Sequence, residues 1–178
     1  SGIAHMGYLL LPLVSLDRAA MTPVLVYLLA YALMNAGAFA VVSLLYARPG
    51  EQHLLAELSG WGYRFPLLGL ALTVCMLSLG GIPPTAGFLG KYLVFLHAIE
   101  HGRLGLALVG IAASLVGVVY YLRVVYMLYM KPEVEAPEGI APDAAGLLAV
   151  ALAAAVTVLF GLLPGGLLEW AVASLPSG

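Results

Sequence analysis

The chain has 178 residues, of which 63% are hydrophobic and only 9% are charged. A soluble domain usually carries about 25% charged residues, so seven basic and nine acidic side chains are too few to cover a soluble globule of this size. A single cysteine excludes a disulfide-stabilised secreted scaffold, and a net charge of −2 argues against a nucleic-acid-binding protein, which needs a basic surface. The composition therefore predicts an all-α, multi-pass membrane protein whose surroundings are the lipid bilayer.

The first half of the chain begins with two predicted membrane helices. The apolar run at 1–16 is shorter than the about 20 residues that a span needs, so we expect a helix truncated at its start, in a piece of a longer protein. A signal peptide is disfavoured because no basic segment or small-residue cleavage site is present. The next span is predicted at 21–46, opened by Thr22-Pro23, and a polar loop at 47–65 is predicted to hold a short interfacial helix near 53–58.

The stretch 66–100 is too long for one regular span. As one helix it would measure about 52 Å, against a hydrocarbon core of about 30 Å. Gly80-Gly81-Ile82-Pro83-Pro84 breaks it, because the prolines remove amide donors and clash with the preceding turn, which leaves predicted short helices at 66–80 and 84–99. Irregular backbone at membrane depth is tolerated where protein buries it or where it lines water, and in transporters it lies beside ion sites. A tight turn between two antiparallel short helices is the other open interpretation.

The remaining sequence predicts two further spans, at 102–130 and 144–163. The loop 131–143 between them carries three prolines and four acidic residues, and 167–175 is predicted to be an interfacial tail. The prediction is thus about six membrane helices. If they alternate in direction, Arg48, Arg64 and Arg103 lie on one side of the membrane, and Arg18 and Lys131 lie on the other. This distribution is too even to set the orientation.

Lys91 is the one formally charged residue between Pro66 and Ile99. It lies about seven residues, or roughly 10 Å, into its predicted span. A charged lysine near the bilayer centre costs about 2.5 to 3.5 kcal/mol, faces protein or water, and often marks an ion path. Because burial disfavours the charged form, such a lysine is suited to relay protons. Gly87, one turn earlier, is expected to leave room for water beside the amine. A lysine that snorkels to the interface is the competing interpretation.

Four other side chains are candidates for a proton path because imidazole and hydroxyl groups can both accept and donate protons. They are His5 in the first span, Ser78 and Thr85 beside the break, and Tyr120 near the end of the 102–130 helix. A hydrogen bond between helices is the alternative role of His5. An anchor at the membrane interface is the alternative role of Tyr120.

No metal or cofactor site is predicted in this chain. His97 and His101 have the i, i+4 spacing that can bind a metal, but the sequence places no third ligand with them, so a solvated loop end is favoured. Cysteine clusters, a nucleotide-binding fingerprint and a haem motif are all missing from the sequence, so redox chemistry is expected in other subunits.

Three segments resemble a known family. Residues 1–8, SGIAHMGY, resemble the S-I-A-H-x-G-Y signature of the antiporter-like subunits of respiratory complex I. Residues 77–91, LSLGGIPPTAGFLGK, resemble the N-type subunit of proton-pumping NADH:quinone oxidoreductase, and 120–124, YYLRV, matches its pattern after the broken helix. The resemblance extends to Met130.

The resemblance implies the C-terminal portion, roughly helices nine to fourteen, of a subunit built from two inverted five-helix repeats. Residues 1–130 would be the C-terminal repeat, and 131–178 a loop, the final membrane helix and an interfacial tail. Lys91 would be the proton-relaying lysine of the discontinuous twelfth helix. NADH, FMN, iron–sulfur clusters and quinone would belong to other subunits of a large hetero-oligomeric complex. The complex would lie in a bacterial inner membrane, with an organellar inner membrane as the alternative.

Two departures from the family pattern bear on how protons reach Lys91. The lysines and glutamate of the first repeat are not in this sequence. The helix 21–46 lacks the lysine that L-type and M-type relatives carry, which favours the N type. A subunit of a multi-subunit cation/proton antiporter and a passive membrane scaffold remain alternative functions. An intramembrane serine protease is disfavoured, because no G-x-S-x-G-like segment faces a partner histidine.

Overall fold

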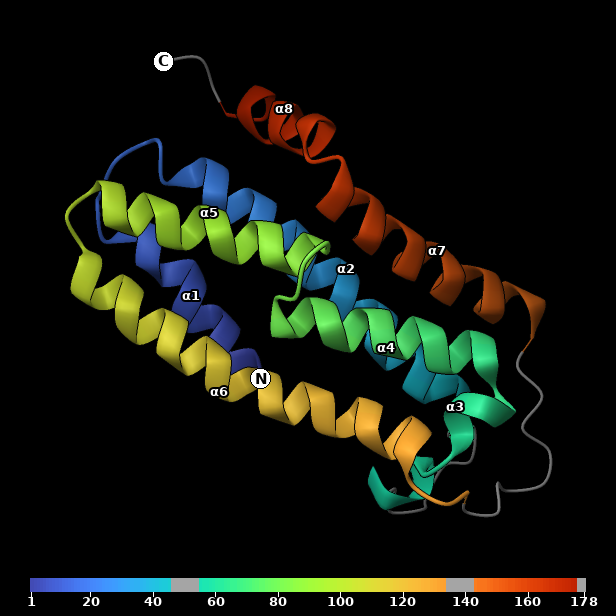
Figure 1. Ribbon diagram of the computed structural model, residues 1–178. Helices are drawn as coiled ribbons and strands as arrows, with labels where there is room; N and C mark the ends of the chain where they lie inside the picture. The colour runs from blue at the N-terminus through green and yellow to red at the C-terminus, as the bar shows by residue number, and fades with distance from the viewer. Residues whose placement is uncertain (46–54, 134–142, 176–178) are drawn as a thin grey trace.

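The computed structural model describes residues 1–45, 55–133 and 143–175, and within these ranges all regular structure is helical, as predicted (Figure 1). Three of the helices, α2, α6 and α7, are long and apolar enough to cross a membrane. The elements in chain order are α1 (Gly2–Leu13), α2 (Met21–Leu45), the 3₁₀ helix η1 (Leu55–Leu58), α3 (Trp61–Arg64), α4 (Pro66–Gly80), α5 (Ala86–Glu100), α6 (Leu104–Met130), α7 (Ala144–Leu162) and α8 (Gly165–Ala173).

The two short helices α4 and α5 are the halves of one broken segment. In Figure 1 they run in the same direction, one after the other, with 81–85 between them. Each half has 15 residues, which is about 22 Å of helix and too short to cross the hydrocarbon core alone. The interpretation of the break as a turn between antiparallel helices is therefore wrong.

The predicted helix boundaries agree closely with the structure. Pro66 starts α4, where its missing amide costs nothing, and Asp143 caps α7 by accepting the Gly146 N–H at 3.2 Å. The short helix expected near 53–58 is η1, although 53 and 54 lie outside the described residues, as do the last residue of the predicted span 21–46 and most of the loop 131–143. The predicted tail is α8.

Two polar contacts identify the ends of the bundle. The α1–α2 connection meets the α5–α6 turn, where His101 Nε2 lies 2.7 Å from Oδ2 of Asp17. At the other end Arg64 pairs with Glu133 at 3.1 Å. Because α6, about 40 Å long, separates these ends, the prediction that Arg64 and Arg103 share one side is wrong. It counted α4 and α5 as two crossings, whereas together they make one.

Helix α2 lies at the centre of the packing, in contact with α4, α5 and α7. Its side chains Tyr27, Met34 and Val41 are fully buried and belong to the main apolar core. Met34 of α2 contacts Ser78 near the end of α4, and Tyr27 of α2 lies against Gly90 near the start of α5, so this central helix packs on both sides of the break.

Candidate functional site

Helix α4 ends in a tight turn that glycine makes possible. Gly81 has a φ of 81°, in the left-handed region that only glycine adopts without strain. Its N–H donates to the Ser78 carbonyl at 2.9 Å, and the Ile82 N–H donates to the Leu77 carbonyl at 2.9 Å. This pair of bonds closes the helix and satisfies two of its last four carbonyls.

The other two carbonyls at the end of α4 cannot be satisfied by the chain that follows. In a continuing helix the carbonyls of Leu79 and Gly80 would accept from residues 83 and 84. Both of these residues are prolines and have no N–H to donate. Two buried carbonyl oxygens, at the negative end of a helix dipole, are left for another donor.

That donor is Lys91, which reaches back from α5 to the end of α4. Its Nζ donates to the Leu79 carbonyl at 3.0 Å, to the Gly80 carbonyl at 3.0 Å and to Ser114 Oγ on α6 at 2.9 Å. The three donors of an ammonium group are thus all used. Lys91 is only 6% exposed, so it is held inside the protein and does not snorkel to the interface.

The space beside Gly87 is filled by protein. The Gly87 N–H donates to Ser78 Oγ at 3.0 Å, and a Cβ at Gly87 would overlap the Ser78 carbonyl. The expectation of water at this glycine is therefore wrong. The missing side chain instead lets the end of α4 approach the start of α5, which places the two free carbonyls within reach of Lys91.

The hydroxyls of Ser78 and Thr85 both bond within the break. Besides accepting from Gly87, Ser78 Oγ lies 3.3 Å from the sulfur of Met34, and Thr85 Oγ1 donates to the Ile82 carbonyl at 2.7 Å. Neither residue lines the two cavities that adjoin Lys91. Ser78 and Thr85, which were predicted to lie on a proton path, thus bond the backbone of the break in the structure.

Two cavities meet at Lys91 and Ser114. One, of about 270 Å³, has polar side chains in its wall and is large enough for several water molecules. The other, of about 550 Å³, is bordered by the break and by apolar side chains of α5 and α6. Polar groups around the first cavity come from α1 and α6 and the residue before α1: Ser1, His5, Tyr8, Ser114, Tyr120 and Tyr121.

Across the polar cavity from Lys91 lies a hydrogen-bonded group centred on His5. His5 is 1% exposed; its Nδ1 bonds the Tyr27 hydroxyl at 2.7 Å, and its Nε2 bonds the Tyr121 hydroxyl at 3.0 Å. The Tyr121 hydroxyl also bonds Ser1 Oγ. Imidazole and hydroxyl groups each donate and accept, so this group can pass a proton in either direction.

The structure brings His5 and Lys91 to one cavity, as a shared path requires. Tyr120 lines the same cavity but is 66% exposed, whereas its neighbour Tyr121 makes the bond to His5. Ser114 and Tyr121 were not among the predicted site residues. The sequence pattern that could have identified them is the stripe of mainly small residues on α6 at 110, 114, 117 and 121, which lies on the face turned toward α5.

The hydrogen bond from Lys91 Nζ to Ser114 Oγ can be tested by removing this one oxygen atom. We expect Ser114→Ala to weaken the hold on the buried ammonium by about 1.5 to 3 kcal/mol, since hydrogen bonds to charged groups contribute that much. Proton movement through the full-length protein in its assembly should slow, with less loss than removal of Lys91 causes. The matched control is Ser174→Ala at the exposed end of α8, which should leave transport unchanged. Equal transport in both variants would show that Ser114 has no part in it.

Comparison with known proteins places this geometry in a family. Residues 1–117 match the family described as NADH:quinone oxidoreductase/Mrp antiporter, TM. The chain is 39% identical over 171 residues to NADH-quinone oxidoreductase subunit N of Trichlorobacter lovleyi, covering 96% of this chain and 35% of that protein. It is 42% identical over 176 residues to the protein of the same name from Geobacter metallireducens, covering 98% and 37%. The chain therefore spans about a third of the length of these curated relatives.

Two solved structures share the fold. A chain of respiratory complex I from Thermus thermophilus with bound aureothin superposes with a TM-score of 0.81 at 36% identity, over 94% of this chain and 37% of that one. A chain of the Mrp complex from a Dietzia species gives the same TM-score of 0.81 at 22% identity, over 94% and 39%. The second likeness shows a common fold alone.

Proposed function

Because the chain belongs to the NADH:quinone oxidoreductase/Mrp antiporter membrane family, we propose that it is the C-terminal part of a proton-translocating subunit N of NADH:quinone oxidoreductase. The complex lies in the inner membrane of a bacterium, and this chain contacts its other membrane subunits. NADH, FMN, iron–sulfur clusters and quinone react in those other parts of the complex. The observation that carries the proposal is that Lys91 is buried and donates to the two carbonyls at the end of α4 that have no backbone donor.

The three groups that bond Lys91 Nζ can satisfy both protonation states of its side chain. The ammonium donates three hydrogen bonds, to Leu79, Gly80 and Ser114. A neutral amine donates two and carries a lone pair, which Ser114 can satisfy by rotating its hydroxyl from acceptor to donor. The proton can therefore leave without stranding a buried polar group, which would cost about 1 to 3 kcal/mol.

The break supplies a means of changing the charge on Lys91. The two carbonyls at the negative end of α4 favour the ammonium while they lie about 3 Å from Nζ. A shift of α4 relative to α5, driven from elsewhere in the complex, withdraws them and releases the proton. The polar cavity then connects Lys91 with His5 and Tyr121, which pass the proton onward.

A cation/proton antiporter is the alternative with the same fold, and the driving force of transport separates the two. The assembled complex containing the full-length protein is reconstituted into sealed vesicles, and proton uptake is recorded. We expect NADH oxidation with a quinone acceptor to drive proton uptake in Na⁺-free medium, and a Na⁺ gradient alone to drive none. Uptake that needs Na⁺ and ignores NADH would contradict the proposal and support the antiporter.

Tyr121 and Tyr120 give a neighbouring pair of variants for the proposed path. Tyr121→Phe removes the hydroxyl that bonds His5, so NADH-driven proton uptake is expected to fall several-fold. Tyr120→Phe removes a hydroxyl that is not bonded to His5, and a smaller loss is expected. A larger effect of Tyr120→Phe would mean that the proton leaves the cavity on the other side of α6.

A further inference from the structure

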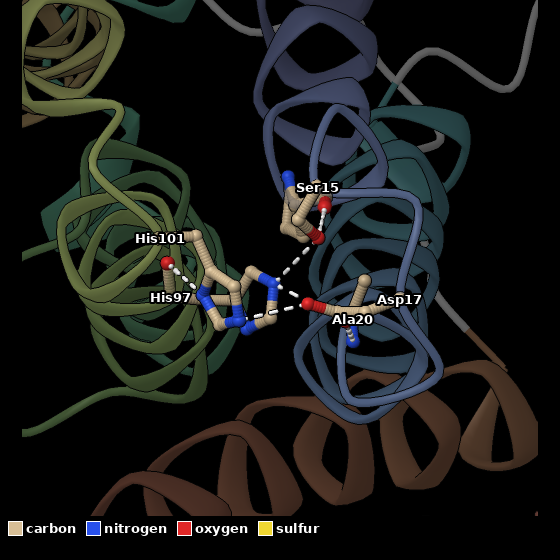
Figure 2. A network of polar contacts seen from close by, with 6 residues as sticks. Ser15, Asp17, Ala20, His97 and His101 are labelled. Carbon is tan, nitrogen blue, oxygen red and sulfur yellow. Dashed lines mark hydrogen bonds and ion pairs between the residues drawn. The ribbon is translucent and has the colours of Figure 1, made fainter.

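A second polar cluster lies at the end of the bundle where the α1–α2 connection meets α5 (Figure 2). It consists of Asp17 from that connection with His97 and His101 from the last turn of α5 and the residue after it. One ligand atom from each residue lies within 4.8 Å of the other two. The expectation that no third candidate ligand lies with the two histidines is therefore wrong, because Asp17, 80 positions before His97, lies beside them.

In neutral His101 the ring nitrogen that can only accept a hydrogen bond faces a carboxylate oxygen of Asp17, which can also only accept. Its Nδ1 lies 2.8 Å from the His97 carbonyl, which can only accept, so this nitrogen carries a hydrogen. In a neutral imidazole the other nitrogen then has a lone pair. That nitrogen, Nε2, lies 2.7 Å from Oδ2 of Asp17. A lone pair and a carboxylate oxygen at this distance require a cation between them, either a proton or a metal ion.

The ring of His97 is placed against the same carboxylate. It stacks on His101 with 4.0 Å between ring centroids, and its Nε2 lies 3.7 Å from Oδ1 of Asp17 and 3.0 Å from Ser15 Oγ. Ser15 donates to the Pro12 carbonyl at 2.7 Å, so its oxygen accepts from the ring. His97 is buried, while Asp17 and His101 are about one-third exposed. The cluster is thus buried on the side of His97 and partly exposed on the side of Asp17 and His101.

We propose that Asp17, His97 and His101 bind a Zn²⁺ ion, with water as the fourth ligand. Two imidazoles and a carboxylate are a known zinc ligand set, with metal–ligand distances of about 2.0 to 2.2 Å. A tetrahedral ion with such bonds places its ligand atoms about 3.3 Å apart. The observed separations of 2.7 and 3.7 Å from the two Asp17 oxygens lie on either side of this value. Binding the ion also requires the hydrogen of His97 to move from Nε2 to Nδ1 and the bond from Nε2 to Ser15 Oγ to break, so that both imidazoles present a lone pair.

The carboxylate of Asp17 is held in place by the backbone. Its Oδ1 accepts from the Ala20 N–H at 2.7 Å, which orients it as bonded carboxylates are oriented in metal sites.

The bound ion would join the α1–α2 connection to α5. His97 lies six residues, or about 9 Å along the helix, from Lys91. Zinc would therefore restrain the half of the broken helix that carries the lysine. This inference does not depend on what Lys91 does, and its test uses binding and spectroscopy in place of transport.

The test measures ⁶⁵Zn²⁺ binding to the detergent-purified assembly that contains the full-length protein. We expect Asp17→Asn and His101→Gln each to abolish one high-affinity binding site per complex, or to weaken it by about tenfold or more. Both variants preserve side-chain size and the capacity to form hydrogen bonds. The matched control is Glu169→Gln, which alters an exposed carboxylate on α8 and should leave the stoichiometry unchanged.

Zinc-edge X-ray absorption of the same samples identifies the ligands. The difference between wild type and Asp17→Asn is expected to show nitrogen and oxygen neighbours at about 2.0 to 2.1 Å with imidazole scattering. Equal zinc stoichiometry in wild type and both variants would overturn the proposal. A lost site whose difference spectrum shows sulfur ligands or no imidazole would overturn it as well.

Discussion

Replacing Lys91 by methionine in the full-length protein is expected to stop most of the proton flow through this subunit. Methionine cannot bind a proton, so the proton would have to pass the break as a charge that no side chain binds. A charge near the bilayer centre costs about 2.5 to 3.5 kcal/mol, which corresponds to a rate roughly a hundredfold lower along this path. The measurement is the initial rate of NADH-driven proton uptake by reconstituted vesicles.

The control for this variant is the other lysine of the chain. Lys131→Met removes an exposed positive charge after α6 and should leave proton uptake unchanged. Methionine at 91 leaves the carbonyls of Leu79 and Gly80 without a donor, but it also removes a desolvated charge, so assembly should persist. Normal proton uptake by a normally assembled Lys91→Met complex would contradict the proposed relay.

The largest effect on stability is expected from Gly87→Ala. The added Cβ would overlap the Ser78 carbonyl, which is backbone in the last turn of α4 and cannot rotate away. Overfilling a packed interior costs about 1 to 3 kcal/mol, and the bond from the Gly87 N–H to Ser78 Oγ would be strained in addition. We expect a lower unfolding temperature and a lower yield of assembled complex, together with slower proton uptake.

Gly105→Ala in the first turn of α6 is the comparison for this substitution. A Cβ there meets nothing within 4 Å, and alanine favours helix over glycine by up to about 1 kcal/mol. The unfolding temperature should stay the same or rise slightly. If Gly87→Ala behaved like Gly105→Ala, the close approach of α4 and α5 would not be what holds the break together.

The break and its lysine could be predicted from the sequence because both depend on local rules. Consecutive prolines after two glycines end a helix wherever they occur, and a lone charge in an apolar run is visible without any structure. The predicted spans 66–80 and 144–163 likewise begin at the first residues of α4 and α7. Local rules could not show in which direction α5 runs relative to α4. The two helices were therefore counted as two crossings, whereas together they make one.

The partners of Lys91 depend on packing between helices and could be derived only in part. The positions of Pro83 and Pro84 already imply that the carbonyls four residues earlier lack donors. Ser114, however, becomes a partner only because one face of α6 packs on α5. The stripe at 110, 114, 117 and 121 includes Tyr121 and not Tyr120, but the sequence does not show that this stripe faces α5 and His5.

The Asp17–His101 contact shows the same limit at a larger distance along the chain. The spacing of His97 and His101 indicated a pair of ligands, but 84 positions separate His101 from Asp17 in the sequence. Only the packing of α1 against α5 brings the carboxylate to the imidazoles. The composition identified the bilayer as the surroundings, and the packing of the helices then brought together the polar side chains around Lys91 and those around Asp17.

The most direct measurement of the central claim is proton uptake by the Lys91→Arg complex, because arginine keeps the positive charge but cannot release its proton. If Lys91 carries the proton, the arginine variant should assemble and yet show proton uptake as low as Lys91→Met. If Lys91 only anchors the break by its charge, arginine should restore uptake toward the wild-type rate, and that result would contradict the account.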